Sequence, residues 1–378
     1  MTTADADHVQ RIRVLWLIKG LGPGGAEQLL VSSARVADHD AFDYSAAYVR
    51  ADKTQLVSAL EAAGVRTTLV RGGHLGWAFA MRTLMKDQHI VHAHSPLLAG
   101  MARLLARTLP SRRRPVTVST EHNVWGNFSL PTRLLNATTA ALDQRRWAVS
   151  GEVRRSMWWP LGRGADVLVQ GVVLSDRRPP DDTRRRVRHE LDIPDGAVVA
   201  ITVANMRREK DYPNLLRAAQ QALQHDPALV VLAVGQGPLA DEVASLHRDL
   251  ALGDSVRLLG YRADVPDLLA GSDVFVLASA HEGLPVSIME AMVSALPVIA
   301  TAVGGVPEAV EDGVTGLLVP AHDPEALAHA LVSVARDRPL REAMGAAARE
   351  RTQRFDIRTT VDVQQRAYAE LATPALST

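Results

Sequence analysis

The sequence predicts an α/β protein built from two doubly wound domains, and three observations lead to that prediction. Its 378 residues exceed what one hydrophobic core usually supports, so two domains of roughly 180 residues each are expected. Short apolar, β-rich runs alternate with longer helical stretches, which is typical of parallel sheets covered by helices. Near residue 176 the chain reads SDRRPPDDTRRRVRHE, a proline-rich and charged stretch that indicates a linker followed by a helix.

These observations divide the chain. We expect an N-terminal Rossmann-like domain over residues 1–178 and a C-terminal Rossmann-like domain over residues 179–355. The tail, residues 356–378, is expected to form one last helix, with packing against the N-terminal domain as one option. Two doubly wound domains facing each other leave a cleft at the carboxyl ends of their strands, where ligands bind in open α/β sheets.

Each expected strand is a short apolar run. In the first domain the runs are residues 12–18, 43–49, 66–70, 89–93, 115–119 and 166–169. In the second they are residues 197–204, 228–235, 256–260, 273–279, 297–301 and 315–320. Helices are expected in most intervals; DPEALAHALVSVARD (323–337), for example, opens with an Asp cap followed by Pro.

The composition excludes several classes of protein and site. No cysteine is present, which excludes disulfides, thiolate metal sites and a cysteine nucleophile. No apolar run approaches the ~18 residues of a membrane span, and MTTADADHVQ has no signal-peptide character, so a cytoplasmic protein is expected. Residues 1–180 carry 23 Lys and Arg against 14 Asp and Glu, which indicates either a basic face for an anionic partner or solvated Arg-rich helices.

The first motif is KGLGPGGAEQLL, residues 19–30, which contains G-x-G-x-x-G at an expected strand-to-helix turn. Free amides and the helix dipole at such a turn suit any phosphate. A dinucleotide site would also need an acidic residue at the end of the second strand, where Asp52 comes later than ideal. An NAD(P)-dependent oxidoreductase is therefore a weak alternative.

The second motif lies in residues 279–324 and contains two glutamates. Glu282 precedes a helix expected to start at Pro285, and Glu290 follows within that helix among apolar residues. A carboxylate in such surroundings needs hydrogen-bond donors, which a ribose diol would supply, although a solvated helix face is the simpler alternative. Gly304 and Gly305 follow a strand and precede a helix near Pro307, which fits close approach of a sugar nucleotide or an ordinary glycine turn.

This segment resembles the donor-binding half of retaining glycosyltransferases of family 4, which have the GT-B architecture. Glu282 and Glu290, with seven residues between them, match the paired glutamates of that family, and GGVPEAVEDGVTGLLVP matches its continuation. The resemblance implies that Glu290 holds the nucleotide ribose and that Glu282 lies by the transferred sugar. It also implies backbone contacts with sugar hydroxyls and phosphates from Gly283, Leu284, Pro285 and Val286, and contacts of the GGAE loop with the donor diphosphate through Gly24 and Gly25.

TVANMRREKDYPNLL, residues 202–216, is similar to the family's phosphate clamp, normally an Arg followed five residues later by a Lys. Lys210 matches the lysine, but Asn205 stands at the arginine position. Arg207 or Arg208 could replace it, and we favour Arg207. Fixed cations stabilise the charge that develops on the departing nucleotide. No Asp-x-Asp lies among these motifs to hold a divalent ion opposite the diphosphate, so no metal is expected. No other cofactor is expected either.

Three histidines lie at or just after the ends of expected strands. His92 and His94 share one face, a spacing that permits a metal pair but shows no third ligand. In the family this pair lies at the cleft edge, and we assign His94 to the acceptor side. His122 in STEHNVWGN matches a family histidine near the donor sugar, where it would orient the sugar rather than act as a base. Structural roles are the alternative for each.

The resemblance implies a retaining, metal-independent glycosyltransferase that forms an α-linkage from a nucleoside diphosphate sugar, in surface glycan, glycolipid or small glycoside biosynthesis. Glycan, lipid-linked and small-molecule acceptors all stay open, and no nucleic acid partner is expected. Trp158 and Trp159 with neighbouring arginines, and SRRR (111–114), could contact the inner face of an anionic membrane or be packed and solvated residues. A GT-B sugar nucleotide epimerase and an inactive GT-B binding scaffold are the alternatives.

Overall fold

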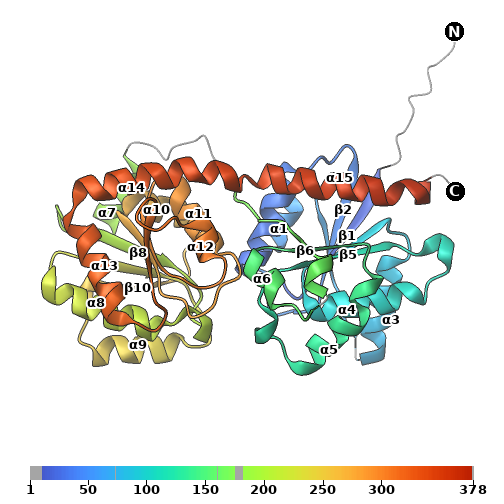
Figure 1. Cartoon of the computed structure of the whole chain (residues 1–378), viewed down its shortest axis with the longest axis horizontal. Coiled ribbons are helices and arrows are strands. Elements are labelled where there is room, and N and C mark those ends of the chain that lie inside the picture. Colours follow the sequence, from blue (N-terminus) through green and yellow to red (C-terminus); the bar gives the residue numbers. More distant parts are fainter. Residues whose placement is uncertain (1–10, 73, 160, 175–181, 377–378) are drawn as a thin grey trace, which may run out of the picture. The chain divides into compact units, whose positions relative to one another are not determined.

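The computed structural model describes residues 11–72, 74–159, 161–174 and 182–376. The chain forms two compact units (Figure 1). The first unit comprises the chain up to Gln170 together with the residues from Ile357 onward, and the second runs from Gly171 to Asp356. The chain therefore passes between the units twice. The expected boundary after residue 178 lies among residues 175–181, outside the described residues; the division falls at Gln170 instead.

The described part of the first unit contains one parallel sheet in the order β3-β2-β1-β4-β5-β6-β7. Its strands are β1 (Ile12–Ile18), β2 (Phe42–Tyr48), β3 (Arg66–Leu69), β4 (Ile90–Ala93), β5 (Val116–Glu121), β6 (Arg145–Ala148) and β7 (Asp166–Val167). The strand order reverses between β1 and β4, which makes their carboxyl ends the switch point of a Rossmann-type sheet.

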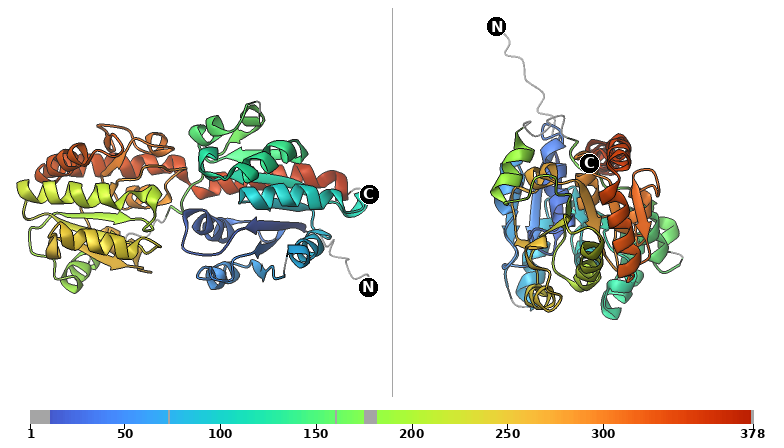
Figure 2. Two further views of the ribbon diagram at one scale, coloured as in Figure 1. Left: turned by 90° about the horizontal axis from the view of Figure 1, so that it is seen from below. Right: turned by 90° about the vertical axis from the view of Figure 1, so that its left-hand side faces the viewer.

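Helices cover both faces of this sheet (Figure 2). They are α1 (Gly25–Val36), α2 (Val57–Ala62), α3 (His74–Met85), α4 (Pro96–Arg107), η1 (Ser111–Arg113), η2 (Trp125–Asn127), α5 (Leu130–Thr139), η3 (Ala140–Leu142), α6 (Gly151–Ser156), η4 (Leu161–Gly164) and α15 (Ile357–Leu376). One face packs against α1, α2 and α15, and the other packs against α3 and α4. Alternate residues of β1 enter the two cores, Trp16 on the first face and Leu17 on the second.

The second unit has a parallel sheet of the same kind within its described residues, in the order β10-β9-β8-β11-β12-β13. Its strands are β8 (Val199–Val203), β9 (Val230–Val234), β10 (Val256–Gly260), β11 (Val274–Leu277), β12 (Val298–Thr301) and β13 (Gly316–Val319). Here the order reverses between β8 and β11. Their carboxyl ends are therefore the place where a ligand is expected in this unit.

Its helices are α7 (Thr183–Glu190), η5 (Arg208–Lys210), α8 (Tyr212–His225), α9 (Ala240–Asp249), η6 (Gly253–Ser255), α10 (Val265–Gly271), α11 (Val286–Val293), α12 (Val306–Ala309), α13 (Pro324–Arg336), α14 (Arg338–Arg351) and η7 (Thr352–Phe355). The expected helix at 323–337 is α13, and the side chain of Asp323 caps it by accepting a hydrogen bond from the Ala326 amide at 2.9 Å.

Two strands of the first unit differ from expectation. Strand β6 was not predicted, because RRWA begins with two arginines and offers only Trp147 and Ala148 as buried apolar residues. Strand β7 ends at Val167 rather than at residue 169. The other strands lie within a few residues of the apolar runs that predicted them.

Helix α15 completes the core of the first unit from the far end of the chain. Ala367 and Tyr368 lie in the same apolar cluster as β1 and β2 residues. Gln365 donates a hydrogen bond from Nε2 to the Tyr44 hydroxyl at 3.0 Å, and Thr360 donates to the Val169 carbonyl at 3.0 Å. No helix of the described residues is both long and apolar enough to cross a membrane.

Candidate active site

Three loops meet at the carboxyl ends of the second unit's central strands. The loop after β8 holds Lys210, the loop after β11 holds Glu282, and the loop after β12 holds Gly304. Backbone hydrogen bonds join them: the Ala280 amide donates to the Glu209 carbonyl at 2.9 Å, and the Gly305 amide donates to the Gly283 carbonyl at 2.8 Å. Residues far apart in sequence are thus held in one constellation.

Lys210 and Glu282 form an ion pair at the centre of this constellation. The Lys210 Nζ lies 2.5 Å from the Glu282 Oε1, and the side chains are 21% and 7% exposed. The same oxygen accepts a hydrogen bond from the Ser279 hydroxyl at 2.6 Å. Thr301 in turn donates to the Ser279 carbonyl at 2.5 Å. The carboxylate is therefore held by two donors on the same oxygen, an ammonium group and a hydroxyl.

The glycine at 304 has a structural explanation. Its φ is +60°, in the left-handed region, and a Cβ placed there would lie 1.9 Å from the Glu282 carbonyl oxygen. Any other residue would displace the backbone of Glu282. The need for glycine thus follows from the packing of two loops, whereas sequence reasoning offered approach of a sugar nucleotide or an ordinary turn.

Glu290 lies on α11 beside buried Met289 and Ala291, as its neighbours in sequence indicated. The side chain is half-buried, and among the described residues no hydrogen bond or ion pair to its carboxylate is found. Burial raises the pKa of Glu290 to about 7. A carboxyl group without a hydrogen-bond partner is stabilised by any ligand that donates hydrogen bonds to it. Pro285 caps α11 without a side-chain hydrogen bond, so the helix proper begins at Val286.

The loop after β8 presents further cations. Arg207 and Arg208 are both exposed and flank the turn that carries Lys210. Asp211, at φ +42°, holds this turn: its carboxylate accepts hydrogen bonds from the Asn214 amide at 3.3 Å and from His322 Nδ1 at 2.6 Å. Either arginine can serve an anion at this loop.

In the first unit, Gly24 and Gly25 mark the start of α1, at the carboxyl end of β1. A Cβ on Gly24 would lie 2.3 Å from Glu27 Oε2, so the carboxylate of Glu27 folds back over the helix start. A phosphate placed here would meet that negative charge as well as the helix amides. After β2, Asp52 is engaged by Arg50 at 2.6 Å, which further weakens the dinucleotide interpretation.

His92 is a core residue of the first unit. It is fully buried, Nδ1 lies 2.5 Å from the Tyr368 hydroxyl and Nε2 lies 2.8 Å from the Thr120 hydroxyl. Burial lowers the pKa of His92 to about 3. Both ring nitrogens are occupied by the protein, so the alternative of a His92–His94 metal pair is wrong. In the part of the chain that the structure describes, no three His, Cys, Asp or Glu side chains cluster as metal ligands.

His94 pairs instead with His122. The Nδ1 of His94 lies 3.2 Å from the Nε2 of His122, at the carboxyl ends of neighbouring strands β4 and β5. Burial lowers the pKa of His94 well below its ordinary value and that of His122 to about 4. Both rings are therefore neutral at pH 7, and one donates to the other. His94 Nε2 is buried and has no partner among the described residues.

Sequence reasoning missed Glu121, which precedes His122 at the end of β5. Its side chain is 3% exposed, and burial raises the pKa of Glu121 to about 7. Its Oε2 finds no partner among the described residues. The available signal was a charged residue directly after the strand expected at residues 115–119, beside His122. Its neighbours include a buried ion pair, Arg103 Nη2 to Asp143 Oδ2 at 2.6 Å.

Residues 183–351 match the family described as Glycosyl transferases group 1, so the second unit contains a domain of that family. A D-inositol 3-phosphate glycosyltransferase of Saccharomonospora viridis is 34% identical over 254 residues, 63% of this chain and 58% of that protein. An N-acetyl-alpha-D-glucosaminyl L-malate synthase of Bacillus anthracis is 32% identical over 165 residues, 44% of this chain and 43% of that protein. The chain spans about half the length of the curated relatives it matches.

Solved structures share the fold over nearly the whole chain. Anabaena HepE in complex with UDP-glucose superposes with a TM-score of 0.83 at 20% identity, covering 97% of this chain and 100% of that one. WaaG, a glycosyltransferase involved in lipopolysaccharide biosynthesis, gives 0.71 at 16% identity, covering 95% and 99%. The protein therefore has the GT-B fold of two Rossmann-like units, as its sequence motifs indicated.

Proposed function

We propose that this protein is a retaining glycosyltransferase that moves a sugar from a nucleoside diphosphate sugar to an acceptor hydroxyl with an α-linkage. The observation that carries the proposal is the Lys210–Glu282 pair of 2.5 Å at the switch point of the second unit, with Glu290 following on α11. The group 1 domain and the names of the relatives support the same activity.

The second unit would supply most of the donor-binding groups. Lys210 and Arg207 would balance the diphosphate charge, and Arg208 is the alternative to Arg207. Glu290 would accept hydrogen bonds from the ribose diol. The backbone amides of Gly283, Leu284 and Val286, at and before the start of α11, would donate to phosphate or sugar oxygens, whereas Pro285 between them has no N–H. Gly304 and Gly305 would position Glu282 beside the sugar through the loop contact described above.

The first unit would supply the remaining groups. His122 would orient the sugar and His94 the acceptor, both as neutral rings, and Gly24 and Gly25 would meet the diphosphate. In the transfer step the anomeric C–O bond to the phosphate breaks, and the acceptor oxygen bonds to the same carbon on the same face. The acceptor proton passes to the leaving phosphate oxygen. Because Lys210 and Arg207 supply positive charge, we propose that no divalent metal is needed.

The nucleobase, sugar and acceptor are open within this proposal. UDP is the first nucleotide to test, because HepE structures contain UDP and UDP-glucose. D-inositol 3-phosphate and L-malate appear in the names of the curated relatives, so small anionic acceptors come before glycans and lipid-linked acceptors in a panel. We also propose that the protein works in the cytoplasm and associates peripherally with the membrane.

A thermal-shift panel with UDP, GDP, ADP, NAD and NADP, with and without magnesium, tests the donor site. A ligand at one hundred times its dissociation constant stabilises the folded state by about 2.7 kcal/mol. We expect one nucleoside diphosphate to raise the melting temperature without magnesium, and Glu290→Ala to abolish the rise. A response to NAD or NADP alone would overturn the proposal.

Turnover separates the proposal from its rivals. Release of nucleoside diphosphate with an α-linked product supports the transferase, and the anomeric configuration can be read by NMR. Conversion of a sugar nucleotide to its epimer without any acceptor would favour the epimerase. Nucleotide binding without turnover on the full acceptor panel would favour an inactive scaffold.

A further inference from the structure

Exposed apolar side chains gather on three helices of the first unit. Ten large apolar side chains are exposed among the described residues, and five belong to α3, α4 and α5. These five are Phe79 (70% exposed), Leu97 (51%), Leu104 (44%), Leu130 (57%) and Leu134 (48%). We call these five residues, together with the exposed Arg107, Arg112 and Arg113, the outer helical surface. A group of exposed apolar side chains often marks an interaction site, whereas single scattered ones do not.

The three helices form one layer. On α4, Leu97 and Leu104 are seven residues apart and share a side, whereas Leu98 and Ala102 face the sheet core. Arg82 of α3 donates to the Thr108 hydroxyl at the end of α4 at 2.9 Å. A Cβ on Gly100 of α4 would lie 2.5 Å from Leu135 of α5, so these helices pack closely. In Figure 1 the layer lies on the side of the first unit's sheet opposite α1 and α15.

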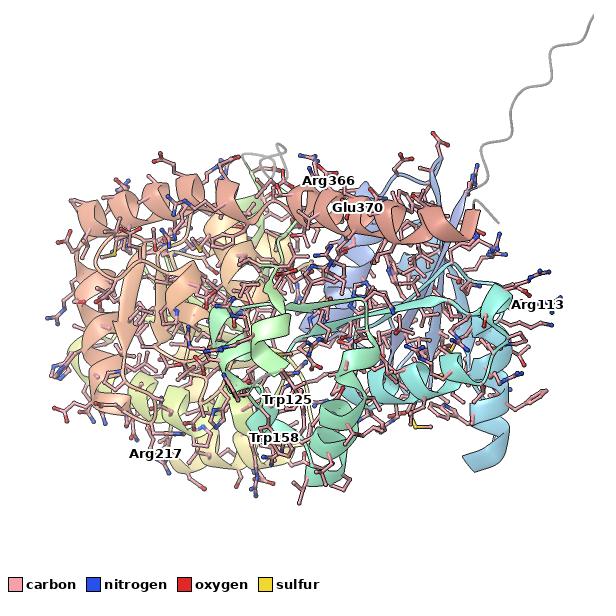
Figure 3. All side chains as sticks on the ribbon, turned by 45° about the vertical axis from the view of Figure 1, so that its right-hand side comes forward. Arg113, Trp125, Trp158, Arg217, Arg366 and Glu370 are labelled. Carbon is pink, nitrogen blue, oxygen red and sulfur yellow. The ribbon has the colours of Figure 1, made fainter. Side chains whose placement is uncertain are left out.

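The charge of this layer is strongly one-sided. Residues 72–142 contain eight Lys and Arg against two Asp and Glu; Arg103 and Glu121 are buried, which leaves seven basic residues and Asp87. Arg107, Arg112 and Arg113 are exposed at the end of α4 and on η1. Figure 3 shows Arg113 projecting from η1 away from the ribbon. Exposed leucines and arginines are therefore combined on one face with a single exposed carboxylate.

We propose that the outer helical surface docks this protein on an anionic lipid bilayer. Leu and Phe side chains enter the boundary between headgroups and acyl chains, and the arginines bind lipid phosphates. A second copy of the chain is a poorer occupant, because two such basic faces repel and Asp87 alone could pair with an arginine of the other copy. The inference deepens the proposed membrane association and rests on it, but not on the transfer reaction.

This surface differs from the one that sequence reasoning suggested. Trp159 is 74% exposed but stacks under Arg163, whose Cζ lies 5.2 Å from the ring centroid. Trp158 packs against buried Trp125, with 6.1 Å between ring centroids, and Figure 3 shows the two together. These contacts engage both tryptophans within the protein, so they are at most an edge of the docking site.

Co-sedimentation with vesicles tests the proposal on the full chain. The vesicles contain phosphatidylcholine alone or with phosphatidylglycerol. The test variants are Leu104→Ser/Leu134→Ser and Arg107→Gln/Arg112→Gln/Arg113→Gln. The matched controls replace exposed residues of the second unit, as Tyr261→Ser/Val314→Ser and Arg185→Gln/Arg217→Gln/Arg248→Gln. Circular dichroism melts and the nucleotide thermal shift establish that each variant is folded.

We expect the wild type and both controls to bind only the anionic vesicles, more weakly as salt rises. Each basic residue near the surface is worth about five-fold in affinity, so the triple arginine variant should lose roughly 100-fold. Nucleotide binding without vesicle binding would overturn this inference and leave the transferase proposal standing. A wild-type dimer that Leu104→Ser/Leu134→Ser dissociates, with no vesicle binding, would make the face a subunit interface instead. Equal losses in the controls would also overturn it.

Discussion

Lys210 and Glu282 lie 72 positions apart in the chain, yet their charged atoms approach to 2.5 Å at the carboxyl ends of two parallel strands. The pair joins the loop after β8 to the loop after β11. Lys210 therefore has two possible partners in the proposed cycle, the carboxylate of Glu282 and the diphosphate of the donor. An exchange between them would couple donor binding to the position of Glu282.

Lys210→Met should reduce both stability and turnover. It leaves the largely buried Glu282 carboxylate without its cation, at a cost of about 1–3 kcal/mol in the free energy of unfolding. Urea unfolding measures this cost. Lys210→Met/Glu282→Gln should regain part of the stability but none of the turnover. Arg217→Met, an exposed cation on the same unit, is the control and should change neither by more than about 0.5 kcal/mol.

Gly304→Ala should be far more damaging than Gly313→Ala. Both glycines have positive φ, +60° and +73°, so both substitutions carry backbone strain of about 1 kcal/mol or more. Only at residue 304 would the added Cβ strike another atom, the Glu282 carbonyl oxygen, whereas nothing lies within 4 Å at residue 313. Melting temperatures and turnover of the two variants separate the effect of this contact from that of backbone strain. Equal effects of the two substitutions would contradict the packing described here.

The Glu290 carboxyl should make stability fall with rising pH. Its pKa of about 7 is above the value of 4.5 expected in the unfolded chain, so the folded state binds more protons between these values. Its contribution is thus favourable below pH 4.5 and is lost as pH rises through about 7. Glu290→Gln should match the wild type at pH 4 and be more stable at pH 8.

Nucleotide binding provides a second test of the same carboxyl. Ribose hydroxyls donate best to the ionised form, so the affinity of the wild type should increase from pH 6 to pH 8. The affinity of Glu290→Gln should be lower and flat over this range. Calorimetric titration with the nucleotide at three pH values measures these affinities. A wild-type affinity that does not change with pH would show that Glu290 does not bind the ribose.

Tyr368→Phe should destabilise the first unit by about 1–2 kcal/mol, because His92 Nδ1 then loses its partner in a fully buried position. Tyr261→Phe, at a residue 51% exposed, is the control. Urea unfolding followed by the tryptophan fluorescence of the first unit reports the difference. A cost no larger than that of the control would mean that the Tyr368–His92 hydrogen bond does not contribute.

The histidines of the first unit should make the protein sensitive to acid. Burial lowers the pKa values of His92 and His122 to about 3 and about 4, whereas both lie near 6.5 in the unfolded chain. The unfolded state therefore binds more protons below pH 6.5, and stability should fall as pH drops from 7 towards 4. Melting temperatures from pH 4 to 8 measure this slope. His122→Gln should reduce it, because one histidine no longer titrates.

Much of this fold could be predicted because parallel strands buried on both faces leave continuous apolar runs in the sequence. Strand β6 left no such run, since Arg145 and Arg146 lead into Trp147. The boundary at Gln170 could not be found from composition, because the charged segment that follows is not where contacts change. Local sequence patterns identify a strand, whereas tertiary contacts define the boundary of a domain.

The site was predictable to the extent that its residues follow strands. Lys210, Glu282 and Gly304 each come after a predicted strand, and strand order brings them together. The His94–His122 contact and the burial of Glu121 depend on the neighbouring positions of β4 and β5, which no local pattern states. The role of His92 depends on Tyr368, which is 276 positions away in the chain.

Helix α15 has a consequence for how the protein is made on the ribosome. The core of the first unit contains Tyr368 and Ala367, so it stays incomplete until translation has passed these residues. The second unit, which ends at Asp356, has its whole sequence available earlier. The usual order, in which N-terminal domains fold first during synthesis, is therefore reversed at the last step. Until then the part of the first unit's sheet face that Ala367 and Tyr368 cover stays open between the residues packed by α1 and α2, and a nascent-chain chaperone could bind there.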